Sequence, residues 1–169
     1  MLLRMISSLN KWDKESNPII REDPSFPADA VTDLKTTRNK LSVWEAGTDD
    51  EINDAIVAMA LGRDSIAKLC FVYLDENELD RIGIKAIQDE SGSAPGIESI
   101  DLLNRHMNLQ HLDYVRLGSL TDYIYHQLDA NKFIIKTKQE LNDLLISYKE
   151  KGIIATDKIK DHLREKLKW

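Results

Sequence analysis

The sequence of 169 residues holds a single cysteine, Cys70. One thiol can form no disulfide within the chain and no multi-cysteine metal site, so neither a disulfide-stapled fold nor a zinc finger is expected. Cys70 lies in the apolar run LCFVYL, where a cysteine is expected to be a buried, unreactive part of the core. The cysteine content therefore argues against thiol chemistry.

Long apolar segments are also missing. No stretch approaches the roughly 20 consecutive apolar residues that span a bilayer. The first residues, MLLRMISSLNKW, have no sustained apolar stretch and no small-residue cleavage signal. We therefore expect a cytoplasmic protein with no membrane partner. The spacing of Leu2, Leu3, Ile6 and Leu9 predicts a short amphipathic helix that packs on its own domain.

The familiar catalytic signatures are absent as well. The sequence contains no phosphate-binding loop with Lys and Ser/Thr, no GxGxxG, no GxSxG, no HExxH and no cysteine-histidine finger. These patterns identify nucleotide-binding folds, α/β-hydrolases, zinc proteases and zinc modules. An enzyme with a recognisable signature is therefore disfavoured, and neither a cofactor nor a metal site is predicted.

The composition is that of a folded protein with an uneven charge distribution. Hydrophobic residues make up 42% of the chain and charged residues 31%, a balance that disordered chains lack. Residues 1–129 carry 13 basic and 23 acidic side chains, whereas residues 130–169 carry 10 basic and 6 acidic ones. The acidic body argues against unspecific binding of nucleic acid, and only the basic tail remains eligible for a polyanion.

The middle of the chain alternates strand-like and helix-like segments. LSVWEA at 41–46, LCFVYL at 69–74 and GIKAIQ at 83–88 are expected to be strands. Thr48 and Glu51 have the spacing of a capping box, so a helix is predicted to begin between the first two strands. This order predicts an α/β or α+β fold, with a small three-stranded or a larger mixed sheet and flanking helices.

Two further cues concern the connections. Asp75 and Glu78 repeat the capping-box spacing and predict a short helix after the second strand. The segment 13–40 contains Pro18, Pro24 and Pro27 and is expected to be an extended arm, because each proline fixes its own φ and restricts the residue before it. The turn-forming segment 89–96 is expected to be a loop.

The second half is expected to be mainly helical. A helix is predicted from about Ser99, followed after a kink or break by another that ends near Leu128. Thr137 with Glu140 predicts a further helix that Gly152 terminates, and Thr156 is expected to cap the last one. We expect residues 1–129 to form the body and residues 130–169 to form a helical hairpin that packs on the same domain.

Four residues are candidates for catalysis. His106 and His111 lie five positions apart, which on a continuous helix points their side chains in different directions, so a shared metal ion is not expected. His106 falls near the predicted buried stripe and is interpreted as a hydrogen-bonded core or boundary residue. If the first two strands are parallel neighbours, Glu45 and Asp75 meet at one sheet edge, where they could hold a cation or share a proton. With a histidine they would form a metal-dependent hydrolase or nuclease.

The leading hypothesis is a non-enzymatic accessory or protein-interaction subunit of a larger cytoplasmic assembly. The C-terminal residues expected to bind the partner are Lys158, Leu163, Arg164, Leu167 and Trp169, since an amphipathic helix with an aromatic anchor suits a groove on another protein. The alternative is that Trp169 folds back on its own domain. A third hypothesis is binding of nucleic acid through the basic C-terminal helices.

Overall fold

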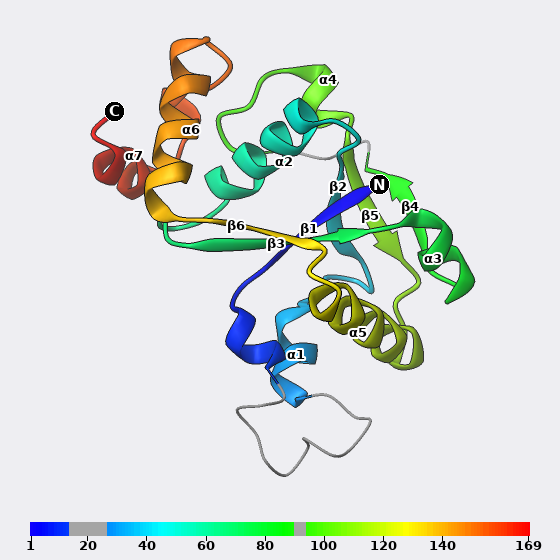
Figure 1. Ribbon diagram of the computed structural model, residues 1–169. Coiled ribbons are helices and arrows are strands. Elements are labelled where there is room, and N and C mark those ends of the chain that lie inside the picture. Colours follow the sequence, from blue (N-terminus) through cyan, green and yellow to red (C-terminus); the bar gives the residue numbers. More distant parts are fainter. Residues whose placement is uncertain (14–26, 90–93) are drawn as a thin grey trace.

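The computed structural model describes residues 1–13, 27–89 and 94–169. It confirms the predicted fold class, because the described residues form an α+β fold in which one six-stranded sheet is flanked by helices (Figure 1). The strand order is β4-β5-β2-β1-β3-β6, and every pair of neighbouring strands is antiparallel. The sheet is thus twice as wide as its three most evident strands indicate.

The three strands expected from the sequence are present, and three more join them. The strands are β1 (Leu2–Ile6), β2 (Leu41–Glu45), β3 (Leu69–Leu74), β4 (Lys85–Gln88), β5 (His106–Gln110) and β6 (Phe133–Lys136). The predicted N-terminal helix is wrong, because that segment is the strand β1 between β2 and β3. Leu2 and Leu3 are both fully buried on opposite faces of the sheet. A strand covered on both faces is apolar at successive positions, and this pattern resembles one side of a helix.

The predicted helix starts are largely confirmed. α2 (Asp49–Leu61) and α6 (Lys138–Glu150) each begin with a complete capping box. α3 (Glu76–Arg81) begins after Asp75, whose side chain accepts a hydrogen bond from the backbone N–H of Asn77. These motifs work locally, since a side chain satisfies an N–H group that has no partner within the helix.

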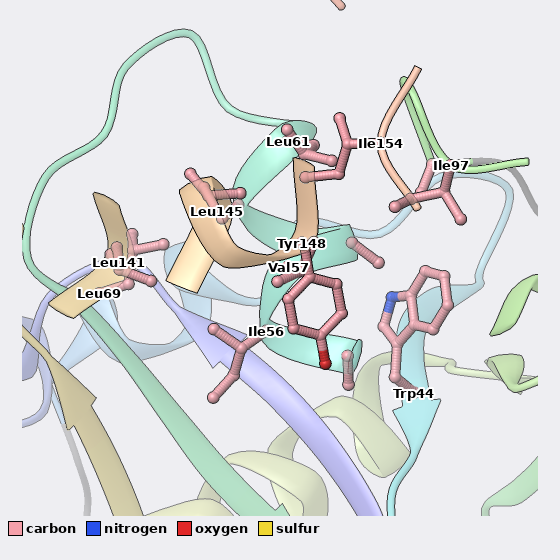
Figure 2. Packing of buried hydrophobic residues seen from close by; sticks show 14 of the residues in the cluster. Trp44, Ile56, Val57, Leu61, Leu69, Ile97, Leu141, Leu145, Tyr148 and Ile154 are labelled. Carbon is pink, nitrogen blue, oxygen red and sulfur yellow. The ribbon is translucent and has the colours of Figure 1, made fainter. Parts of the chain in front are cut away.

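The helices pack on both faces of the sheet and create two cores. On one face, α2 and α6 bury a cluster that includes Trp44, Leu69 and Phe71, with Tyr148 and Leu145 contributed by α6 (Figure 2). On the other face, α1 (Ala28–Asp33) and α5 (Tyr114–Asp129) cover a second cluster around the opposite sides of the same strands. Because both faces of the sheet are covered, most side chains of β1, β2 and β3 are buried.

The region from Ser99 to Leu128 differs from its prediction. A single helical turn, α4 (Ile100–Leu103), follows Ser99, and the chain then forms β5 before α5 begins. His111 has a φ of 59° directly after β5, and Asp113 caps α5 by accepting a hydrogen bond from the N–H of Arg116. Asp113 was the sequence signal for the start of a new helix. The segment HMNLQ of β5 has no β-branched residue that would indicate a strand.

Two further predictions need correction. The segment 13–40 is not extended throughout, because it includes α1, while residues 14–26 lie outside the described residues. The last helix, α7 (Asp161–Leu167), begins later than Thr156, which instead opens a short 3-10 turn, η2 (Thr156–Lys158). Residues 130–169 also contribute β6 to the sheet edge beside β3. Of the predicted loop 89–96, residues 90–93 lie outside the described residues.

Candidate functional site

The sheet has a split between its two central strands. β1 pairs with β3 along five residues, but it pairs with β2 only at Leu2 and Leu3, opposite Glu45 and Trp44. Beyond Leu3 the strands β1 and β2 diverge, so the backbone groups there lose the ladder partners that a continuous sheet provides. The first residue after this divergence is Arg4.

Arg4 lies in the split. Its guanidinium donates a hydrogen bond from Nη1 to the backbone carbonyl of Ser42, at 2.8 Å, and so replaces the missing ladder contact. Its Nε is buried without a hydrogen-bond partner in the described chain. No carboxylate of the described residues forms an ion pair with Arg4, although Asp33 acts on it at longer range. Burial lowers the pKa of Arg4 to about 10 while Asp33 opposes that change, so the side chain stays cationic at neutral pH.

Arg4 lines three adjoining hollows. We refer to the three together as the Arg4 hollow. The largest, of about 420 Å³, lies along β2 and the turn before it, and the others, of about 260 and 290 Å³, lie towards α2 and α1. The basic side chains that line the Arg4 hollow are Arg4, Lys11, Lys35, Arg38, Lys40 and Arg63. Among the described residues, the acidic side chains that line it are Asp33 and Asp89. A concentration of positive charge therefore surrounds a concave surface in a body that is acidic overall.

The rim of the hollow is held by a tight turn. Thr37 and Lys40 exchange two backbone hydrogen bonds, of 3.0 and 3.1 Å. The two residues between them, Arg38 and Asn39, have φ values of 53° and 60°, which is the backbone geometry of a type I′ turn. The carbonyl of Asn39 accepts a hydrogen bond from the N–H of Leu112. This turn fixes the positions at which Arg38 and Lys40 leave the backbone.

On the same side as Trp44, His106 lies between a serine and an aspartate. Its Nε2 is 2.5 Å from Ser42 Oγ, and its Nδ1 is 3.3 Å from Asp89 Oδ2. The Trp44 ring centroid lies 5.0 Å from the imidazole centroid, and only 12% of the His106 side chain is exposed. Burial lowers the pKa of His106, and Asp89 acts in the opposite direction. The neutral imidazole is therefore favoured at neutral pH.

The structure does not bring the four candidate catalytic residues together. β2 and β3 run parallel, but β1 separates them, so Glu45 and Asp75 end two strand spacings apart, roughly 10 Å. His106 pairs with Trp44 and lies on the same face of the sheet. Glu45 follows Trp44 along β2, so its side chain points to the opposite face from His106. His111 lies at the far end of β5 and is exposed. Within the described ranges, no three potential metal ligands form a group.

The C-terminal residues expected to bind a partner are engaged within the chain. Leu163 is completely buried, and Leu167 and Trp169 pack against the same cluster. Lys149 Nζ lies 5.1 Å from the Trp169 ring centroid. Lys158 forms an ion pair with Glu98, and Arg164 forms one with Asp161. Trp169 thus follows the alternative of folding back on its own domain, and docking through this surface stays a prediction.

Sequence reasoning missed Arg4, Ser42 and Asp89. Arg4 was visible as the single charge within the apolar run LLRMI, and a charge inside a core strand is unusual enough to indicate a special role. Ser42 and Asp89 carry no local signal, because they approach His106 only through the pairing of β2 with β5 and of β4 with β5.

Comparison with known proteins gives no family. No protein-family model, no curated protein and no solved structure matches the chain. In the described parts of the chain, no helix is both long and apolar enough to cross a membrane.

Proposed function

We propose that this protein binds a small phosphorylated ligand in the Arg4 hollow, with the Arg4 guanidinium holding the anionic group. The observation that carries the proposal is the largely buried guanidinium, which has an unpartnered Nε and no ion pair within the described chain. Burial of a charge is costly unless an opposite charge or several hydrogen bonds compensate it. A bound anion would supply both.

Phosphate suits this surface better than a single carboxylate. An arginine fork binds phosphate oxygens through two parallel hydrogen bonds. Arg4 has further cationic neighbours in Lys35, Arg38 and Lys40 around the largest part of the hollow, and these could balance the higher charge of a phosphate group. A hollow of about 420 Å³ is within the range of small-molecule sites.

A long polyanion fits less well. The basic side chains surround a concavity, while the rest of residues 1–129 carries an excess of acidic groups, which repels an extended chain of phosphates. Part of the charge of the basic tail is also neutralised, since Lys160 and Arg164 pair with Asp64 and Asp161. The sequence also predicts that the protein is a subunit of a larger cytoplasmic assembly. Binding of a small phosphorylated ligand is compatible with that role, which remains part of the proposal.

Calorimetric titration of the full-length protein with pyrophosphate tests the proposal. We expect saturable binding with one site and a dissociation constant of about 1 mM or lower, since two charge-assisted hydrogen bonds contribute about 1.5–3 kcal/mol each. Raising the ionic strength from about 0.01 to 0.15 M should weaken binding less than tenfold, because salt screens the exposed lysines but not the buried Arg4. Sodium chloride at matched ionic strength is the control titrant. Absence of saturable heat would contradict the proposal.

A further inference from the structure

The chain Ser42–His106–Asp89 has the connectivity of a nucleophile, a general base and a carboxylate that orients the base. Ser42 Oγ lies 2.5 Å from His106 Nε2, and His106 Nδ1 lies 3.3 Å from Asp89 Oδ2. The three residues come from three neighbouring strands or their ends: β2, β5 and the residue after β4. Such a constellation is recognised by its geometry, because sequence order and fold vary among the enzymes that use it.

The backbone fixes this geometry. In the β2–β5 ladder Trp44 pairs with His106 and Ser42 pairs with Asn108, so Ser42 is the diagonal neighbour of His106 on one face of the sheet. The N–H of Asp89 donates to the carbonyl of His106 at 3.0 Å, which holds Asp89 beside the imidazole. Side chains on paired strands are more firmly placed than side chains on a free loop.

The position of Asp89 favours one tautomer. His106 Nδ1 is buried and forms no hydrogen bond of normal geometry, but the Asp89 carboxylate 3.3 Å away favours by its charge the imidazole with its proton on Nδ1. This leaves Nε2 free to accept the proton of the Ser42 hydroxyl. His106 is also kept neutral by burial, and a general base must be neutral to act. Asp89 is a positioning residue in this arrangement, since it acts through His106.

The serine is open to a ligand. Ser42 is half-buried and lines two of the three parts of the Arg4 hollow, one with Arg4 and Asn108 and one with Arg4 and His106. A ligand whose phosphate group is held by Arg4 therefore lies beside Ser42 Oγ. The side-chain amide of Asn108, which pairs with Ser42 across the β2–β5 ladder and lines the same hollow, is a nearby donor for an oxyanion that forms next to Ser42.

We propose that Ser42 is a nucleophile for acyl transfer and that its substrate is an ester that carries a phosphate group. The choice of substrate rests on the proposed function, in which Arg4 binds the phosphate. Ser42 Oγ forms a bond to the ester carbonyl carbon while its proton passes to His106 Nε2. The tetrahedral intermediate collapses, the bond to the leaving alcohol breaks, and His106 returns the proton to that alcohol. Water then attacks the acyl-serine by the same route, which releases the acid and restores Ser42.

The test uses diisopropyl fluorophosphate, a neutral reagent that does not require the anion site. Its phosphorus forms a bond to Ser42 Oγ, fluoride leaves, and His106 accepts the proton. Intact-mass measurement and peptide mapping of the full-length protein are expected to find one phosphoryl adduct, on Ser42. Ser42→Ala should abolish it, while Ser119→Ala, a change on the distant helix α5, should not. His106→Gln should slow modification by about 100-fold or more, the range for loss of a general base.

The pH profile separates a catalytic arrangement from a merely structural one. Within the described residues, the charged groups near His106 are Asp89, directly after β4, Arg4 from β1 and Arg63, two residues after α2. Asp89 raises the pKa of His106, so Asp89→Asn should move the midpoint of the labelling rate to lower pH and lower the plateau. Circular dichroism checks that each variant is folded.

The outcomes for the two proposals are distinguishable. Modification of Ser42 that depends on His106 supports the nucleophile, and slower modification in the presence of pyrophosphate places the anion in the same hollow. Pyrophosphate binding without modification of Ser42 overturns the nucleophile and leaves the anion site intact. Modification of Ser42 without pyrophosphate binding contradicts the proposed function alone. Equal rates for wild type and a folded His106→Gln also overturn the nucleophile.

Discussion

Replacement of Leu163 by alanine is expected to lower the free energy of unfolding by about 2–5 kcal/mol, a large part of the roughly 5–15 kcal/mol that stabilises a typical domain. Leu163 belongs to α7, close to the end of the chain, yet it is completely buried in the cluster that contains Leu3 and Phe71 of the central strands. Alanine removes most of its apolar contacts and leaves a cavity that a packed core closes only in part.

The matched control is Leu167→Ala on the same helix. Leu167 is partly exposed and packs at the margin of the cluster, so its truncation should cost about 1 kcal/mol or less. Urea unfolding followed by circular dichroism measures both variants. If Leu163→Ala cost no more than Leu167→Ala, the C-terminal segment would be an appendage whose apolar residues are available to a partner.

Replacement of Arg4 by methionine is expected to weaken pyrophosphate binding by about 10- to 100-fold, since hydrogen bonds to a charged group contribute about 1.5–3 kcal/mol. Stability should change by only about 1 kcal/mol, because two effects oppose each other. Methionine removes the desolvation cost of the buried charge and keeps the hydrocarbon volume. It also leaves the carbonyl of Ser42 without the donor that Arg4 provides.

Two further substitutions sharpen this result. Arg4→Lys keeps the charge but loses the planar fork, so binding should fall between wild type and Arg4→Met. Arg81→Met removes an arginine that is 72% exposed on α3 and paired with Glu78, and it should leave binding unchanged. Calorimetry gives the affinities and thermal unfolding gives the stabilities. Equal affinity of wild type and Arg4→Met would remove Arg4 from the site.

The predictable part of the fold is the part specified by local chemistry. The helix starts at Thr48, Asp75 and Thr137 follow from side chains that satisfy backbone groups within three residues. The strands β2 and β3 follow from compact apolar runs. β1 and β5 could not be identified in the same way, because LLRMI and HMNLQ contain few β-branched or aromatic residues. Each owes its conformation to pairing with distant segments rather than to intrinsic preference.

The candidate site depends even more on distant pairing. The sequence identifies His106 as a candidate residue but predicts it on a helix. Its neighbour Ser42 lies 64 positions away in the sequence, so a helical position could not indicate this contact. Arg4 acquires its role only because β1 and β2 separate after two residue pairs. The order of strands is also decisive: Glu45 and Asp75 end at the same sheet edge, as expected for parallel strands, but the insertion of β1 keeps them apart.

The most direct test of the anion site is a nuclear magnetic resonance titration of the ¹⁵N-labelled full-length protein with pyrophosphate. Saturable shifts are expected for the Arg4 Nε–Hε signal, for the Ser42 amide and for the amides of residues 37–40, because these groups line or support the Arg4 hollow. The same signals should not respond in Arg4→Met beyond the effect of salt. Shifts confined to residues 149–168, or none that saturate, would contradict an anion site at Arg4.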